Sequence, residues 1–223
     1  MKRGLIIAAA IIATAGMASA QTVVGTDHDL SSSGPGATTN VGRVCVFCHT
    51  PHQATASNGQ DPLWNHTLSS QATYGVYSST TLNAVPAEIG GATVGTAAPS
   101  NLCMSCHDGS VAVHSLYNPP NEVGTITISS NGSNVNAAGF MTGTPNVGTD
   151  LTDDHPVNFT YDTALANADG GLVDPAGSPA VQALLNGGMV QCGSCHDPHN
   201  DTNSPFLVTP NTNSALCTTC HIK

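Results

Sequence analysis

All eight cysteines of this 223-residue chain fall into four CxxC pairs, and a histidine follows each pair directly. Ten residues are histidine, so histidine in all four of these places by chance has odds of roughly 1 in 250,000. The chain must therefore fold around whatever these thiols and imidazoles hold. The four motifs are CVFCH at 45–49, CMSCH at 103–107, CGSCH at 192–196 and CTTCH at 217–221.

CxxCH is the attachment signature of c-type haem. Two thiols form thioether bonds with the vinyl groups of one porphyrin, and the adjacent imidazole becomes the proximal iron ligand. The sequence therefore predicts four covalently bound haem c groups. The predicted attachment residues are Cys45, Cys48, Cys103, Cys106, Cys192, Cys195, Cys217 and Cys220. The predicted proximal ligands are His49, His107, His196 and His221.

Three other uses of paired cysteines explain the pattern less well. A disulfide framework suits an exported chain but gives no reason for four adjacent histidines. Structural zinc would combine two pairs, or one pair with a histidine pair. Thioredoxin-like chemistry needs one CxxC on an α/β fold. Haem attachment is the favoured interpretation.

Each haem iron accepts a second axial ligand, and six histidines lie outside the motifs. Methionine is scarce beyond the N-terminal segment, so ligation by two histidines is expected, with low reduction potentials. The predicted second ligands are His28, His52, His66, His155 and His199. His114 alternates with apolar residues, so we expect a packed or surface histidine there. Six candidates exceed four positions, so some are spare.

Two of these histidines, His52 and His199, lie only three residues beyond a proximal ligand. Three residues span at most about 10 Å, which is too short to pass round a porphyrin to its opposite face. Pro51 and Pro198 also favour an extended preceding residue, which directs the chain away. Each of these histidines must serve a different haem, in this chain or a neighbouring one, or none.

The N-terminal segment is typical of a cleaved signal peptide. Lys2 and Arg3 precede an apolar run over 5–15, and small residues at 18–20 offer a cleavage site. We expect residues 1–20 to be removed, leaving 21–223 as one tetrahaem domain without a membrane span. The product is expected to be extracellular or on the cell surface, with the periplasm as the alternative.

Charge excludes several classes of function. Beyond residue 20, Arg43 and Lys223 are the only lysine or arginine residues, against 14 acidic residues. Such a chain cannot bind nucleic acid phosphates, and it lacks the basic clusters that hold anionic substrates. A haem enzyme also needs an open iron position, whereas spare histidines outnumber the irons here. We expect an electron carrier and not an enzyme.

The expected fold is a mostly irregular, haem-packed multihaem cytochrome c with short α-helices at the CxxCH motifs and little β-structure. Only nine residues are aromatic, and long polar stretches separate the motifs, so haem rather than side chains should fill the interior. Alternation and an Asn-Gly pair predict a short hairpin within 125–135. Ser178 followed by Pro179 predicts a helix over 178–185.

The order HDLS, CVFCHTPH, PLWNH, CMSCHDG, DHPVNF, CGSCHDPH and CTTCH resembles the OmcE-like secreted tetrahaem cytochromes of metal-reducing bacteria. That resemblance implies four bis-histidine haems, polymerisation into extracellular cytochrome nanowires, and one axial histidine donated between subunits, with His52 as the donor. It also implies redox partner cytochromes or extracellular metal oxides. A monomeric periplasmic tetrahaem shuttle is the alternative, and docking through charged patches is typical of such carriers.

Mass spectrometry of the secreted protein tests the attachment motifs directly. We expect a chain that begins at Gln21 and carries additional mass equal to about four haems. A mature chain of the unmodified polypeptide mass would refute the haem interpretation.

Overall fold

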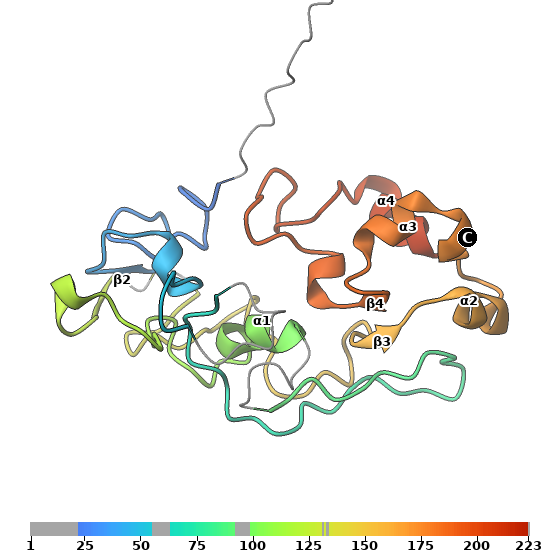
Figure 1. Ribbon diagram of the computed structural model, residues 1–223, viewed down its shortest axis with the longest axis horizontal. Helices are drawn as coiled ribbons and strands as arrows, with labels where there is room; N and C mark the ends of the chain where they lie inside the picture. The colour runs from blue at the N-terminus through green and yellow to red at the C-terminus, as the bar shows by residue number, and fades with distance from the viewer. Residues whose placement is uncertain (1–21, 55–62, 92–98, 131, 133, 223) are drawn as a thin grey trace, which may run out of the picture.

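The computed structural model describes residues 22–54, 63–91, 99–130, 132 and 134–222, and the predicted signal peptide and Lys223 lie outside them. Long loops connect short regular elements across this part of the chain (Figure 1). No helix among these residues is long and apolar enough to cross a membrane. The expectation of a mostly irregular chain with little β-structure is confirmed.

The α-helices are α1 (Ser100–His107), α2 (Thr163–Asp169), α3 (Pro179–Leu184) and α4 (Ala215–Cys220). The 3-10 turns are η1 (Cys45–Phe47), η2 (Asn121–Val123), η3 (Pro175–Gly177), η4 (Cys192–Ser194) and η5 (Thr212–Ser214).

A helical turn occurs at every CxxCH motif, but only two of the four are α-helices. The second motif lies in α1 and the fourth in α4, whereas the first and third lie in the 3-10 turns η1 and η4. The prediction of α-helices was wrong for those two. The difference lies before the motif, because α1 and α4 begin two or three residues ahead of the first cysteine, whereas η1 and η4 begin at the cysteine itself.

The helix predicted from Ser178 is confirmed as α3. The Ser178 hydroxyl accepts a hydrogen bond from the backbone N–H of Val181 at 3.3 Å, and Pro179 occupies the first helical position. Helix α2 was not predicted. Asp162 caps its start, and Gly170, in a left-handed conformation that favours glycine, ends it.

Two antiparallel strand pairs are present among the residues described. Strand β1 (Thr38–Thr39) pairs with β2 (Ile128–Ser130), and β3 (Phe159–Thr160) pairs with β4 (Met189–Val190). The prediction of a hairpin within 125–135 was therefore wrong, because β2 pairs with β1 and not with a strand from its own segment. Ile128 packs against a buried cluster that includes Ala37, next to β1. A three-residue strand gains little from a local turn, so burial of its apolar side chain decides the pairing.

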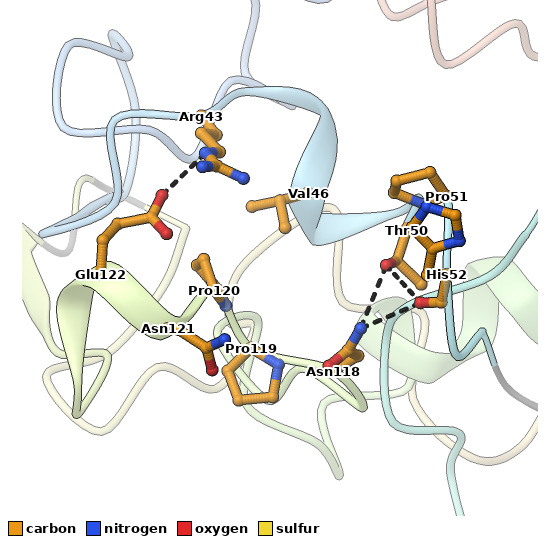
Figure 2. Close-up of a pocket in the computed structure, with 10 residues that line it drawn as sticks. All are labelled: Arg43, Val46, Thr50, Pro51, His52, Asn118, Pro119, Pro120, Asn121 and Glu122. Carbon is orange, nitrogen blue, oxygen red and sulfur yellow. Dashed lines mark hydrogen bonds and ion pairs between the residues drawn. The ribbon is translucent and has the colours of Figure 1, made fainter.

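A cavity separates the first motif from the segment around η2. The ion pair between Arg43 Nε and Glu122 Oε1 spans it at 2.7 Å, and both side chains are substantially exposed (Figure 2). Such an exposed pair contributes little to stability, about 1 kcal/mol or less. Val46 and Pro120 line the same cavity, with His52 on the opposite side.

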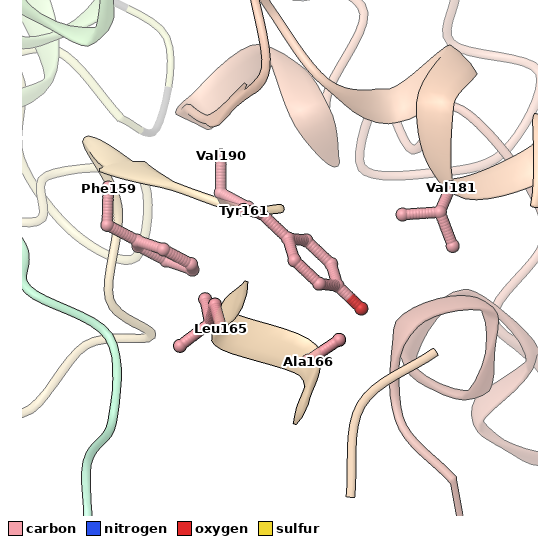
Figure 3. Packing of buried hydrophobic residues seen from close by; sticks show 6 residues of the cluster. All are labelled: Phe159, Tyr161, Leu165, Ala166, Val181 and Val190. Atoms are coloured by element: carbon pink, nitrogen blue, oxygen red, sulfur yellow. The ribbon is translucent and has the colours of Figure 1, made fainter. Parts of the chain in front are cut away.

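Buried apolar side chains form three small clusters, and the described residues show no larger core. The largest lies where β3, β4, α2 and α3 meet (Figure 3). Its Tyr161 hydroxyl donates to the carbonyl oxygens of Val173 and Cys220, which joins this cluster to the fourth motif. The clusters are Phe159, Tyr161, Leu165, Ala166, Val181 and Val190; Tyr74, Ile89, Met104 and Leu151; and Ala37, Val113 and Val135.

Tyr74 provides a test of how much one buried hydrogen bond contributes to the free energy of unfolding. Its hydroxyl is buried and donates to Asp108 Oδ2 at 2.8 Å, directly after the second motif. Tyr74→Phe should lower the free energy of unfolding by about 1.5–3 kcal/mol, since a hydrogen bond to a buried carboxylate is lost. Guanidinium denaturation of the haem-loaded protein, followed by far-UV circular dichroism, measures this change.

Tyr77→Phe is the matched control, because Tyr77 is half-buried and none of the hydrogen bonds described involves its hydroxyl. Its effect should stay within about 0.5 kcal/mol. Equal stability losses for the two variants would contradict the assignment.

Candidate functional site

The local backbone brings each motif's thiols and imidazole to one side of a single helical turn. In three motifs the histidine N–H donates to the carbonyl of the first cysteine, and the second motif lies within α1. One turn separates the two ends of each motif, so both thiols and the ring can meet one porphyrin edge and its iron. The distances are 2.9 Å from His49 to Cys45, 3.0 Å from His196 to Cys192 and 2.9 Å from His221 to Cys217.

Three of the motif histidines each face a second histidine from a distant part of the chain. Every such pair joins one predicted proximal ligand to one predicted second ligand. The ring centroids are 6.1 Å apart for His28 and His107, 6.0 Å for His49 and His199, and 6.3 Å for His155 and His221. The interplanar angles are 88°, 14° and 79°, respectively.

These separations match what an iron between two imidazoles requires. Nitrogen ligands at about 2 Å on both sides of a metal place the two ring centroids about 6.3 Å apart. Direct aromatic contact covers a similar range, about 4.5–7 Å, so distance alone does not decide the matter. The composition of the pairs favours iron ligation over direct aromatic contact, because each pair contains one motif histidine and one histidine from outside a motif. The residues present fit bis-histidine haem.

Carbonyl oxygens orient three imidazoles of these pairs and the imidazole of His196, and each of the four acceptors belongs to a proline. A carbonyl can only accept, so Nδ1 carries the proton and Nε2 keeps the lone pair that a metal needs. Burial, followed by the neighbouring His107, lowers the pKa of His28, which favours the neutral ligand form. The Nδ1–oxygen distances are 3.3 Å from His28 to Pro198, 2.7 Å from His107 to Pro145, 2.9 Å from His155 to Pro156, and 3.0 Å from His196 to Pro205.

The cysteines of the first and second motifs lie close together. Burial, followed by the neighbouring Cys106, raises the pKa of Cys48 to about 12. All eight cysteines are within the part of the chain that the structure describes, and none forms a disulfide there. The first motif is therefore adjacent to the second.

The later motifs continue the series. The backbone N–H of Cys192 donates to the Ser100 hydroxyl of α1 at 3.0 Å, which joins the second motif to the third, and the neighbouring Cys103 lowers the pKa of Cys192. Burial, followed by the neighbouring Cys195, raises the pKa of Cys220, which places the third motif beside the fourth. The four motifs thus follow one another in space in the order of the sequence.

His196 and His52 have no such intrachain arrangement. Among the described residues, no second imidazole faces the His196 ring at a distance like those of the three pairs. His52 is exposed, on the turn that follows the first motif. His199, the other histidine three residues past a proximal ligand, faces His49 of a different motif rather than His196.

His66 and His114 lie near the second motif in surroundings unlike those of the pairs. His66 is buried, with Nδ1 2.8 Å from the Thr67 carbonyl and Nε2 3.1 Å from that of Ala112. Ligation by His66 stays a prediction, and it would require Nε2 to leave Ala112. Nδ1 of His114 is buried with no hydrogen-bond partner in the described part of the chain.

Sequence reasoning missed the groups that orient the imidazoles. Pro145 and Pro205 contribute through their carbonyl oxygens, and a backbone acceptor leaves no mark on residue type. Phe206 packs on the His28 ring with centroids 4.3 Å apart and an interplanar angle of 34°. Asp197 Oδ1 lies 3.6 Å from Nδ1 of His199, so that ring also meets an acceptor on its Nδ1 side. Among these orienting groups, only Asp197 could have been inferred from the sequence, because it is an acidic residue two positions before His199.

A family model described as "Doubled CXXCH motif" matches residues 183–223, which contain the third and fourth motifs. No curated protein matches the chain. The doubled motif supports a multihaem c-type cytochrome that binds haem covalently and transfers electrons.

Replacement of one paired second ligand tests the pairing. His28→Ala should convert one haem from six-coordinate low-spin to five-coordinate high-spin, because its iron loses the imidazole opposite His107. Electron paramagnetic resonance and CO binding to the reduced protein measure the change. His114→Ala is the control and should leave every haem low-spin. A fully low-spin His28→Ala protein that does not bind CO would rule out this pair.

Proposed function

We propose that the protein carries electrons through four c-type haems, each held by two histidines, as a subunit of an extracellular cytochrome filament. It acts as a conductor and not as an enzyme. The order of the motifs in space is the observation that best supports conduction, since the thiols of each motif lie near enough to those of the next to shift their pKa, from the first motif to the fourth.

The residues of the chain perform three tasks in this proposal. Haem supplies a reversible one-electron ferric–ferrous couple when bound. The cysteines hold each porphyrin by one edge, so adjacent motifs bring adjacent edges together. The paired imidazoles fill both axial positions, which leaves no open position for a substrate. The prolyl carbonyls fix the tautomer and orientation of the rings.

Two histidines that are not paired with each other within one chain support assembly. His196 has no partner ring among the described residues, and His52 is exposed beside a different motif. We propose that His52 of one subunit binds the haem attached next to His196 of its neighbour. Each subunit would then offer one ligand and receive one, which is a head-to-tail contact that propagates into a filament.

The proposed setting is outside the cell, after removal of the predicted signal peptide. Redox cytochromes would donate electrons to the filament, and other cytochromes or extracellular metal oxides would accept them. The scarcity of lysine and arginine, with only Arg43 between residue 20 and the C-terminal Lys223, argues against partners that need a basic docking patch.

A monomeric periplasmic shuttle is the second candidate, and one observation favours it. Asp150, Asp153 and Asp154 lie near one another, and burial followed by Asp153 raises the pKa of Asp154. This acidic group adjoins His155, a proposed ligand, so a basic partner could dock close to a haem. The mass of the native protein by size-exclusion chromatography distinguishes a shuttle from a polymer.

His52→Ala tests the proposed filament. We expect it to retain all its haems, to show one high-spin haem in four, and to form no filaments in negative-stain images. The loss of a single imidazole should abolish both the sixth ligand and the intersubunit bond.

Gln53→Asn is the control, because asparagine tolerates the left-handed backbone found at this exposed neighbour and leaves His52 intact. It should assemble normally. Filaments of His52→Ala with only low-spin haems would disprove ligand exchange between subunits.

A further inference from the structure

Side chains rather than regular secondary structure hold the turn that carries His52. The Thr50 hydroxyl donates to the His52 carbonyl oxygen at 2.8 Å. The side-chain amide of Asn118 donates to the same oxygen at 2.9 Å and to Thr50 Oγ1 at 3.3 Å (Figure 2). The backbone of His52 is fixed while its side chain stays exposed.

The residue after His52 shows why such support is needed. Gln53 has a φ of 55°, a left-handed conformation that residues with a side chain rarely adopt. A turn of this kind persists only where its surroundings hold it. The two hydrogen bonds to the His52 carbonyl act immediately before this strained position.

Asn118 has a rigid support of its own. Its backbone N–H donates to Asn65 Oδ1 at 2.9 Å, and the Asn65 amide donates to the Asn118 carbonyl at 3.2 Å. Asn65 is fully buried and also donates to the carbonyl of Val46, inside the first motif, at 2.7 Å. Pro119 further restricts the backbone of Asn118. The amide that reaches the His52 turn is therefore held in place from behind.

We propose that Asn118 is a positioning residue, which holds the turn of His52 in the shape that presents its imidazole to the neighbouring subunit. This role rests on the proposed function, in which His52 is the donated ligand. A loose turn would lose backbone freedom at the moment of assembly, and a turn ordered in advance avoids that loss. Asn118 would thus strengthen association without touching haem or the neighbouring chain.

Two substitutions remove the amide donor. Asn118→Ala deletes the side chain, and Asn118→Asp keeps its shape but cannot donate. Both should raise the protein concentration needed for half-maximal filament assembly by about tenfold or more, the effect of freeing a single backbone residue. On dilution, the fraction of high-spin haem should rise at a higher protein concentration than in the wild type, while haem content stays the same.

Asn121→Ala is the matched control. Asn121 lines the same cavity, and none of the described hydrogen bonds links it to the turn at 50–52. Light scattering gives the assembly midpoint, absorbance of the alkaline pyridine adduct gives haem content, and electron paramagnetic resonance gives spin state. The control should match the wild type in all three.

The outcomes separate this inference from the proposed function. Normal assembly of His52→Ala would end both. If His52→Ala fails to assemble while both Asn118 variants assemble at the wild-type midpoint, the filament stands and the positioning role is overturned. If the Asn118 variants lose haem, Thr50→Val decides, because it removes the other donor to the His52 carbonyl, with the acceptor for one Asn118 hydrogen bond, and leaves Asn118 and its support by Asn65 in place. A raised midpoint for Thr50→Val then supports the role of the turn, and a wild-type midpoint overturns it.

Discussion

The structure depends on the meeting of imidazoles from distant parts of the chain. His28 meets His107, His49 meets His199, and His155 meets His221, each across about 6 Å. Every such meeting closes a long loop, which a chain of ordinary side chains could stabilise only by building a core. An iron bound to both rings would supply that closure through coordination, and the thioether bonds would hold it permanently to the backbone.

This constraint accounts for the thin packing elsewhere. The three buried clusters are small, and the largest gathers around Tyr161 beside the fourth motif. Strands of two or three residues and single helical turns suffice when they need only to direct a thiol or an imidazole. The same arrangement suits conduction, because loops without regular structure let the cysteines of successive motifs approach one another from the first motif to the fourth.

The sequence predicted the local backbone at the motifs well and tertiary pairing less well. CxxCH spacing implies a helical turn, and one is present at each motif. The limit of chain length beyond His196 indicated that His199 serves a different haem or none, and the structure places it opposite His49. Residue types could not select that partner, because the pairing results from loops that fold back over 150 residues.

Predictions failed where several weak local preferences compete. The Asn-Gly pair near residue 131 favoured a hairpin, yet β2 pairs with β1, where Ile128 packs, partly buried, against the cluster that includes Ala37. Two of the expected α-helices are 3-10 turns, because helical structure begins only at Cys45 and Cys192 and not ahead of them. The prolyl acceptors and the support of Asn118 by Asn65 are backbone contacts across the fold, and neither periodicity nor composition encodes them.

A cryo-EM map of the native assembly, at a resolution that shows both axial ligands of each iron, tests the central claim most directly. The account predicts irons between His28 and His107, His49 and His199, and His155 and His221, with the iron at His196 completed by His52 of the adjacent subunit. A map in which the two histidines of any of these pairs ligate different irons, or in which His52 faces solvent throughout, would contradict it.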